Sequence, residues 1–168
     1  GDIGNDTVVL GDSDTGNGSS IAGVSFSSAS GNDVFNIAGL TVTGTLALVG
    51  DAGDGDGADT IIATNGANIS ALNGGAVTTA EALTLSGGIT MTVDQHSTNS
   101  TTAAMVITAG GGSETGADAD TVTLTTAGTL TGQADVETYV LSNLGGTTFT
   151  QVAGNVSVTS GLGNDKII

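Results

Sequence analysis

Aspartate is the residue type whose abundance and spacing point most clearly to chemistry in this sequence. Seventeen acidic side chains face a single basic one, Lys166, and the formal net charge is −16. Two carboxylates held about 4 Å apart repel each other by roughly 4 kcal/mol at an effective dielectric constant near 20. Clustered aspartates therefore require a cation, and carboxylate oxygens are hard ligands of the kind that calcium prefers.

The two ends of the chain carry the same Gly-Asn-Asp phrase in front of an aliphatic run. It occupies residues 4–6 in "GDIGNDTVV" and residues 163–165 in "SGLGNDKII". When residue 1 is placed directly after residue 168, the two phrases are nine residues apart. We therefore expect the ends to be consecutive units of one nine-residue repeat, and the chain to be a processed or excised piece of something longer.

Both end segments fit the calcium-binding nonapeptide template G-G-x-G-x-D-x-U-x, in which U is aliphatic. Asp2 replaces the second glycine in one, and Ser160 replaces the first glycine in the other. On these segments the chain resembles the repeats-in-toxin (RTX) family, which occurs in bacterial secreted toxins, proteases, adhesins and surface-layer proteins. "SGNDVFNI", "GDGADTII" and "GADADTVTL" are weaker matches. The resemblance implies a right-handed parallel β-solenoid, a β-roll or β-helix, in which one calcium ion lies between the loops of adjacent coils.

The template also predicts which residues bind the metal. Glycines permit a tight loop whose backbone carbonyls face inward, and the aspartates add negative charge to this cage of oxygens. Together with the acidic stretch at 51–59, the matches give the predicted calcium ligands: Gly4, Asn5, Asp6, Asp12, Asp14, Gly31, Asp33, Asp51, Asp54, Asp56, Asp59, Asp118, Asp120, Gly161, Gly163, Asn164 and Asp165. Val156 stands nine residues before Asp165 in place of an aspartate. Because such units have imperfect partners, we expect a modest affinity of about 10⁻⁴ to 10⁻³ M.

Alternating apolar and threonine residues predict β-strands throughout, and helix signals are almost absent. Residues 40–49, "LTVTGTLALV", alternate in this way, and similar short runs cover 81–93, 120–126, 136–141 and 155–158. The predicted fold is all-β, with residues 1–168 forming a single solenoid unit. With about 18 to 25 residues in each coil, the chain would form roughly seven to nine coils and a rod about 35 to 45 Å long. A β-sandwich adhesin module with calcium at its linkers is the alternative, because short alternating strands also suit sandwiches.

Composition excludes several functions. The absence of cysteine excludes disulfides, zinc thiolate sites and thiol nucleophiles. A single basic residue cannot support phosphate recognition, so nucleic acid is not expected as a partner, and no apolar run is long enough for membrane insertion. No nucleophile, base and phosphate cradle can be assembled, so we do not expect an enzyme. We expect His96 to be an exposed loop residue, Glu137 a surface residue on a strand, and Met91 and Met105 core residues.

These features predict a structural role outside the cell. The expected function is that of a subunit or repeat of a bacterial extracellular filament, surface layer or large adhesin, secreted and then rigidified by calcium. Its expected partner is another copy of itself, either in a tandem array or in a head-to-tail homopolymer, because unpaired strand edges at the two ends of a solenoid can pair with further strands. The alternative is an accessory calcium-binding RTX domain of a secreted hydrolase or toxin.

Overall fold

The computed structural model describes residues 4–10, 20–21, 24–27, 31–37, 40–42, 46–49, 59–64, 67–71, 82–97, 106–109, 120–153 and 157–168. Within these ranges the chain consists of short β-strands with one five-residue helix. The predicted all-β character is therefore confirmed. The strands are β1 (Thr7–Val9), β2 (Ser20–Ile21), β3 (Val24–Ser27), β4 (Val34–Asn36), β5 (Thr41–Val42), β6 (Leu46–Val49), β7 (Thr60–Thr64), β8 (Ala67–Asn68), β9 (Ala82–Ser86), β10 (Gly88–Met91), β11 (Val106–Ala109), β12 (Thr121–Leu124), β13 (Gly128–Thr131), β14 (Thr138–Leu141), β15 (Thr147–Thr150), β16 (Ser157–Ser160) and β17 (Lys166–Ile167), and the helix is α1 (Val93–Ser97).

The strands form parallel sheets. A five-stranded sheet has the order β1-β4-β7-β9-β11, and a seven-stranded sheet has the order β16-β14-β12-β10-β8-β5-β2. Two smaller sheets consist of β13-β15-β17 and β3-β6. Every pairing between the described strands is parallel. Immunoglobulin-like sandwiches are built from antiparallel strands, so this pairing argues against the sandwich alternative.

Successive strands of the chain join different sheets, and the path then repeats. Thus β1, β2 and β3 are followed by β4, β5 and β6, each of which pairs with the strand in the same place of the preceding set. We call the stretch of chain between two residues that are aligned in neighbouring strands of one sheet a circuit. Circuits vary in length: 27 residues separate Asp6 from Asp33, 33 separate Gly87 from Asp120, and 17 separate Asp120 from Glu137. This spread is wider than the sequence led us to expect, because the number of residues between aligned strands differs from circuit to circuit.

The core is a stack of apolar side chains contributed by successive circuits. In the five-stranded sheet Phe35, Ile61, Leu83 and Ile107 are aligned in successive strands and all are buried. The residues beside them point outward, as the two-residue period of a strand requires; Thr84, for example, is exposed. The predicted alternation is therefore present and places one apolar layer on the next.

One detail of the predicted strands differs. The run at 40–49 is split into β5 and β6, although Leu40 is buried as expected. Met91 is a core residue, as predicted, whereas Met105 lies outside the described residues.

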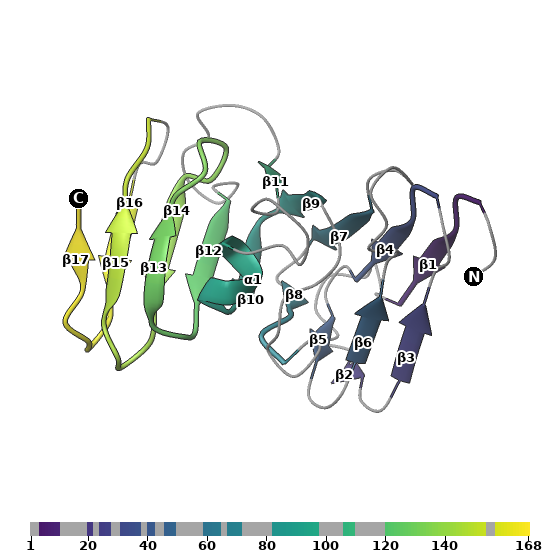
Figure 1. The fold of residues 1–168 in the computed structure, drawn as a ribbon, viewed down its shortest axis with the longest axis horizontal. Helices are drawn as coiled ribbons and strands as arrows, with labels where there is room; N and C mark the ends of the chain where they lie inside the picture. The colour runs from purple at the N-terminus through teal and green to yellow at the C-terminus, as the bar shows by residue number, and fades with distance from the viewer. Residues whose placement is uncertain are drawn as a thin grey trace.

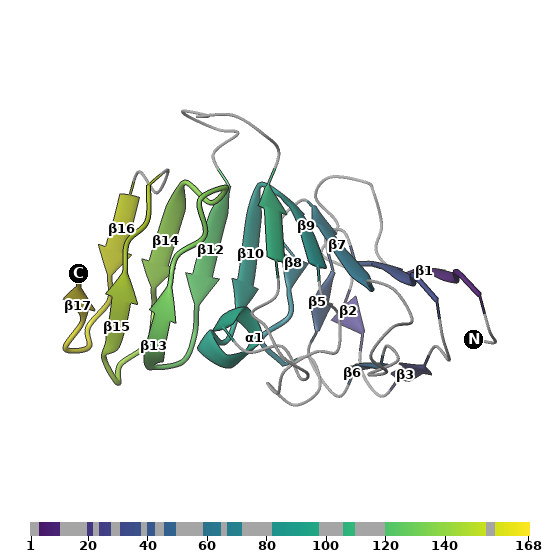
Figure 2. The same ribbon diagram turned by 45° about the horizontal axis from the view of Figure 1, so that its top comes forward.

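The molecule is longer in one direction than in the others, and its termini lie at opposite ends of that direction (Figure 1). The strands of the seven-stranded sheet lie side by side along most of this length (Figure 2). Among the described residues, no helix has the length and apolar character needed to cross a membrane.

Helix α1 was not predicted, and it begins with a reciprocal pair of hydrogen bonds. The Gln95 backbone N–H donates to Thr92 Oγ1 at 3.1 Å, and the Thr92 backbone N–H donates to Gln95 Oε1 at 2.9 Å. This arrangement is a capping box, which satisfies two N–H groups that a helix start otherwise leaves without acceptors. The Thr-x-x-Gln spacing in the sequence is the signal that could have identified this helix.

Candidate functional site

The first Gly-Asn-Asp segment stacks directly on a second copy of itself one circuit later. The backbone angles φ of Gly4 and Gly31 are 142° and 137°, and a Cβ atom added at Gly31 would collide with the Gly4 carbonyl oxygen. The Asn32 backbone N–H donates to Asn5 Oδ1 at 2.9 Å. Glycine is required at the first position because only it combines this backbone angle with such a close approach.

The aspartates of these segments continue the stack as a row, Asp6, Asp33 and Asp59, which we call the first carboxylate row. The Asp6 N–H donates to Asp33 Oδ1 at 2.8 Å, and the Asp33 N–H donates to Asp59 Oδ1 at 3.0 Å. In the opposite sense, the Val34 N–H donates to the Asp6 carbonyl oxygen at 2.9 Å. In a regular parallel ladder a backbone carbonyl would accept each aspartate N–H. Here a carboxylate takes that place, so it extends the ladder by one hydrogen bond before the strand begins.

The same device precedes the seven-stranded sheet, in a second carboxylate row formed by Asp120 and Glu137. The Gly87 N–H donates to Asp120 Oδ1 at 2.6 Å, and the Asp120 N–H donates to Glu137 Oε2 at 3.1 Å. Glu137 is only 6% exposed, so its prediction as a surface residue was wrong. It is buried because it occupies, before β14, the position that Asp120 occupies before β12.

The first row contains carboxylate oxygens that accept no hydrogen bond. Asp33 is 1% exposed, and the Oδ2 atoms of Asp6 and Asp33 are buried without a donor. Lys166, the only lysine or arginine of the sequence, is exposed in β17 at the far end of the molecule (Figure 1). An uncompensated buried charge costs several kcal/mol. A bound cation would compensate the charge on these oxygens.

The available donor atoms fit a hard cation. Asp6 and Asp33 lie in neighbouring circuits and each has a buried Oδ2 atom without a donor, and oxygen is the ligand that calcium takes. Among the described residues, no group of three or more histidine, cysteine or acidic side chains could hold a metal ion. A cation bound here would therefore complete its shell of six to eight oxygens with backbone carbonyls, asparagine side chains or water.

The C-terminal Gly-Asn-Asp segment differs from the N-terminal one. Asp165 Oδ1 accepts the Thr147 N–H at 2.8 Å, and Asp165 Oδ2 accepts the Gly161 N–H at 3.1 Å. Gly163 packs against the backbone of Gly146, which leaves no room for a side chain at that position. Because both carboxylate oxygens have donors, this segment is stabilised by its own backbone and leaves no charged oxygen without a partner.

The structure thus divides the predicted metal ligands into separate groups. It brings Gly4, Asn5 and Asp6 together with Gly31 and Asp33, and aligns Asp59 with Asp33 although 26 residues, not a multiple of nine, separate the two. Asp120 belongs to the second row, and Gly161, Gly163, Asn164 and Asp165 lie near β15 and β17. The remaining six predicted ligands lie outside the described residues: Asp12, Asp14, Asp51, Asp54, Asp56 and Asp118.

His96 is buried rather than exposed in a loop, so that prediction was wrong. It lies in α1 and is 1% exposed, with its Nε2 atom 3.0 Å from the Tyr139 hydroxyl and the two rings in edge contact at 5.6 Å. Burial lowers the pKa of His96 to about 4. Burial also raises the pKa of Tyr139 to about 12, against the opposing effect of the hydrogen bond from the Gln133 N–H. The capping box accounts for the difference, because it turns this polar segment into a helix whose inner face meets the core.

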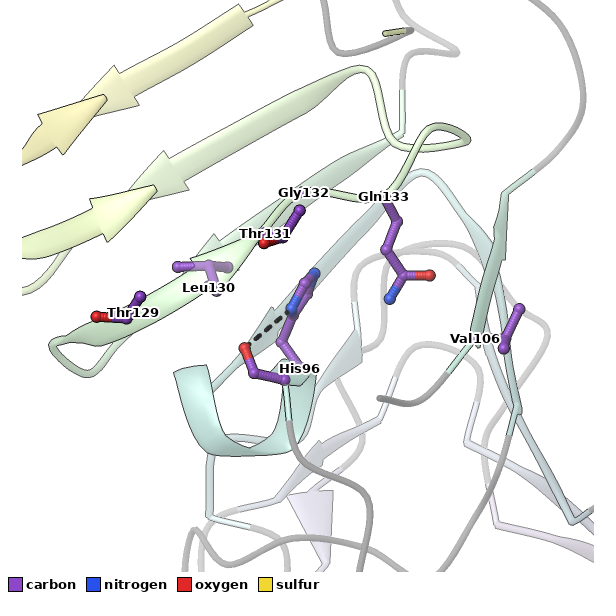
Figure 3. A pocket seen from close by; sticks show the side chains of 8 residues that line it. His96, Val106, Thr129, Leu130, Thr131, Gly132 and Gln133 are labelled. Carbon is purple, nitrogen blue, oxygen red and sulfur yellow. Dashed lines mark hydrogen bonds between the residues drawn. The ribbon is translucent and has the colours of Figure 1, made fainter. Parts of the chain in front are cut away.

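A pocket of about 510 Å³ lies beside α1, between the helix, β11 and β13 (Figure 3). His96 and Ser97 line it on the helix side, and Val106 and Gln133 line it on the other.

No protein-family model, curated protein or solved structure matches the chain. Function is therefore inferred from the geometry described above.

Proposed function

We propose that this chain is a right-handed parallel β-solenoid that serves as a structural repeat of a bacterial extracellular filament, surface layer or large adhesin. Copies are joined head to tail, covalently or as separate subunits, and calcium rigidifies them. The chain contributes no catalytic group to this function, and its partners are calcium ions and further copies of itself.

The repeating circuits support the solenoid. Each set of strands adds one layer to the sheets beneath it, and every described pairing is parallel. Connections between parallel strands of one sheet are right-handed in nearly all proteins, which supports the handedness. Such a stack gains stability from contacts between neighbouring layers and needs no compact centre, as suits a fibre or a lattice.

The observation that carries the calcium proposal is the pair of buried carboxylate oxygens, Oδ2 of Asp6 and of Asp33, that lack hydrogen-bond donors. Both belong to stacked Gly-Asn-Asp segments with a net negative charge, and the chain has no basic side chain near them. A divalent cation would remove the repulsion between successive circuits and add its binding free energy to that of folding. Secretion into a calcium-rich medium would then couple export to folding.

Exposed edges and apolar side chains support assembly with further copies. Leu144, Leu162, Ile167 and Ile168 are exposed in the C-terminal circuits, beside the edge strand β17. Unpaired strand edges are templates for further strands. A repeated heterologous contact of this kind does not close on itself and so generates filaments or lattices.

Calcium titration of three proteins tests the metal site: the unaltered chain, Asp33→Asn and Asp165→Asn. The Asp33→Asn variant keeps an acceptor for the Asp6 N–H but removes the buried charge, so we expect calorimetry to show affinity weakened by about tenfold or more. The Asp165→Asn variant is the matched control, because the Asp165 carboxylate is already satisfied by backbone donors, and we expect a much smaller effect. Equal losses in both variants, or stabilisation by calcium no greater than by sodium chloride at the same ionic strength, would contradict the proposed site.

Assembly has a separate test. Sedimentation and electron microscopy of the unaltered chain should show longer particles with calcium than with chelator. Particles of one unvarying length under both conditions would argue against calcium-dependent head-to-tail assembly, while leaving the metal site to the titration.

A further inference from the structure

The five-stranded sheet ends at β11, and a side chain rather than another strand covers its last edge. The Ile107 backbone N–H, which points away from the neighbouring strand β9, donates to Gln133 Oε1 at 2.8 Å. An unpaired buried N–H would cost about 1 to 3 kcal/mol. Gln133 therefore caps the outer edge of β11, the last strand of this sheet among the described residues.

Gln133 is held in place by Tyr139, and Tyr139 in turn by His96. The Gln133 N–H donates to the Tyr139 hydroxyl oxygen at 2.9 Å, and the hydroxyl lies 3.0 Å from His96 Nε2. Tyr139 is fully buried and packs against Phe149 with the rings tilted by 52° and their centroids 4.7 Å apart. These hydrogen bonds thus join the edge of one sheet to helix α1 through the side chains and backbone N–H of Gln133, Tyr139 and His96.

These hydrogen bonds fit a neutral histidine whose Nε2 accepts the Tyr139 hydroxyl. Because Tyr139 accepts the Gln133 N–H, its own O–H is available to donate to His96 Nε2, which must then carry no proton. In the tautomer that accepts this bond, the proton is on Nδ1, which lies 3.4 Å from Ser97 Oγ. A proton added to Nε2 would lie against the hydroxyl hydrogen of Tyr139. The hydroxyl would then have to rotate so that its hydrogen points into an apolar interior.

No described carboxylate is placed to stabilise a charged His96. On α1 itself the acidic residue is Asp94, and between β13 and β14 the acidic residues are Asp135 and Glu137. Asp94 and Asp135 are exposed, and Glu137 Oε2 accepts the Asp120 N–H. β13, which packs against the helix, has no titratable side chain, and neither do the described residues of β11; β14 contributes Tyr139. The pocket beside the ring gives water a route to this region (Figure 3). Protonation therefore leaves a buried cation without a counter-charge.

We propose that His96, Tyr139 and Gln133 form an acid-sensitive latch: protonation of His96 breaks its bond to Tyr139, releases Gln133 and opens the β11 edge of the five-stranded sheet. The latch acts locally, at the junction between α1, β11 and β14. It does not depend on calcium binding or on assembly, so its test is independent of the tests of the proposed function.

Amide hydrogen exchange of Ile107 tests the latch, with the Val34 amide as an internal reference because Val34 is bonded to Asp6 far from α1. After correction for intrinsic exchange rates, we expect the opening constant of Ile107 relative to Val34 to rise about 50-fold between about pH 7 and 4.5. This factor follows from one histidine with a pKa of about 4 when closed and 6.5 when open. The Gln133 amide should behave like that of Ile107.

His96→Gln is the matched variant, because glutamine can accept the Tyr139 hydroxyl but does not titrate, and it keeps every carboxylate of the chain. Its Ile107 ratio should stay constant over the same pH range. An unchanged ratio in the unaltered chain, or an equal rise in His96→Gln, would overturn the proposal. If the variant does not fold, the nuclear magnetic resonance titration of the single histidine decides: a midpoint near 6.5 refutes the latch, and a midpoint near 4 that coincides with loss of Ile107 protection supports it.

Discussion

An aspartate placed one residue before a parallel strand can substitute for a backbone carbonyl. Its short side chain reaches the aligned residue of the preceding circuit, as Asp33 does with Asp6 and Asp120 with Gly87. The strand pairing can therefore end at this position without leaving a buried N–H group unpaired. Such unpaired groups are rare in proteins. The carboxylates of this chain therefore have a structural task whether or not a cation is bound.

Substitution of Asp120 tests that task. In Asp120→Ala the Gly87 N–H loses its acceptor, and we expect the free energy of unfolding to fall by about 1 to 3 kcal/mol. Asp120→Asn keeps an oxygen acceptor and should remain within about 1 kcal/mol of the unaltered chain, or exceed it, because a buried charge has been removed. Urea denaturation followed by circular dichroism measures both. Equal destabilisation by the two variants would show that charge, rather than hydrogen bonding, is the contribution of this residue.

At the scale of elements, the turns that lead into strands are tight because circuits approach closely there. Gly87 and Gly146 have nearly the same backbone angle, with φ of 84° and 82°. They differ in their surroundings: a Cβ atom at Gly87 would meet nothing within 4 Å, whereas one at Gly146 would lie 2.7 Å from the Asn164 carbonyl oxygen. Substitutions at the two glycines therefore distinguish the cost of a positive φ angle from the cost of a clash between circuits.

Alanine at each of these glycines should produce unequal losses of stability. Gly87→Ala carries only the strain of a positive φ, so we expect a loss of about 1 to 2 kcal/mol. Gly146→Ala carries the same strain and also pushes apart two stacked backbones, so its loss should be larger by about 2 kcal/mol. Thermal and urea unfolding of the two variants under identical conditions supply the comparison. Indistinguishable losses would mean that the close stacking of Gly146 on Asn164 contributes nothing to stability.

At the scale of the whole molecule, each circuit mainly contacts its immediate neighbours. β16 pairs only with β14, and β17 only with β15. In a stack of this kind, stability is close to a sum of terms for layers and for the interfaces between adjacent layers. Removal of an end layer should therefore reduce the stability of the adjacent layer most and that of distant layers least.

Removal of residues 154–168, which include β16 and β17, tests this additivity. The shortened chain should remain folded, and the amides of Val34 and Thr60 at the other end should keep their protection from hydrogen exchange. The Thr147 amide, which loses its acceptor Asp165 Oδ1, should lose protection by about tenfold or more. Loss of protection throughout the chain would instead indicate one cooperative unit with no layered independence.

Much of the fold could be predicted from residue patterns, because the strand period and the turn residues act over short distances. The alternation around Leu83 and Leu85 and the turn before Asp33 are examples in which local sequence is sufficient. The helix at residues 93–97 was missed because its apolar signal is weak, and its capping box lies in a segment dominated by strand formers. The burial of His96 and of Glu137 followed from neighbours 43 and 17 residues away, which no local pattern reveals.

The candidate site was predicted in its residue types but not in its arrangement. Sequence spacing treated Asp6 and Asp165 as equivalent members of one repeat, and only the folded chain distinguishes an oxygen without a donor from one that the backbone already satisfies. The sequence by itself determined that the chain forms short strands separated by Gly, Asn and Asp turns with an excess of negative charge. The tertiary structure decided which strands align, and hence which carboxylates meet, because the unequal lengths of the intervening loops set the register between residues far apart in the chain.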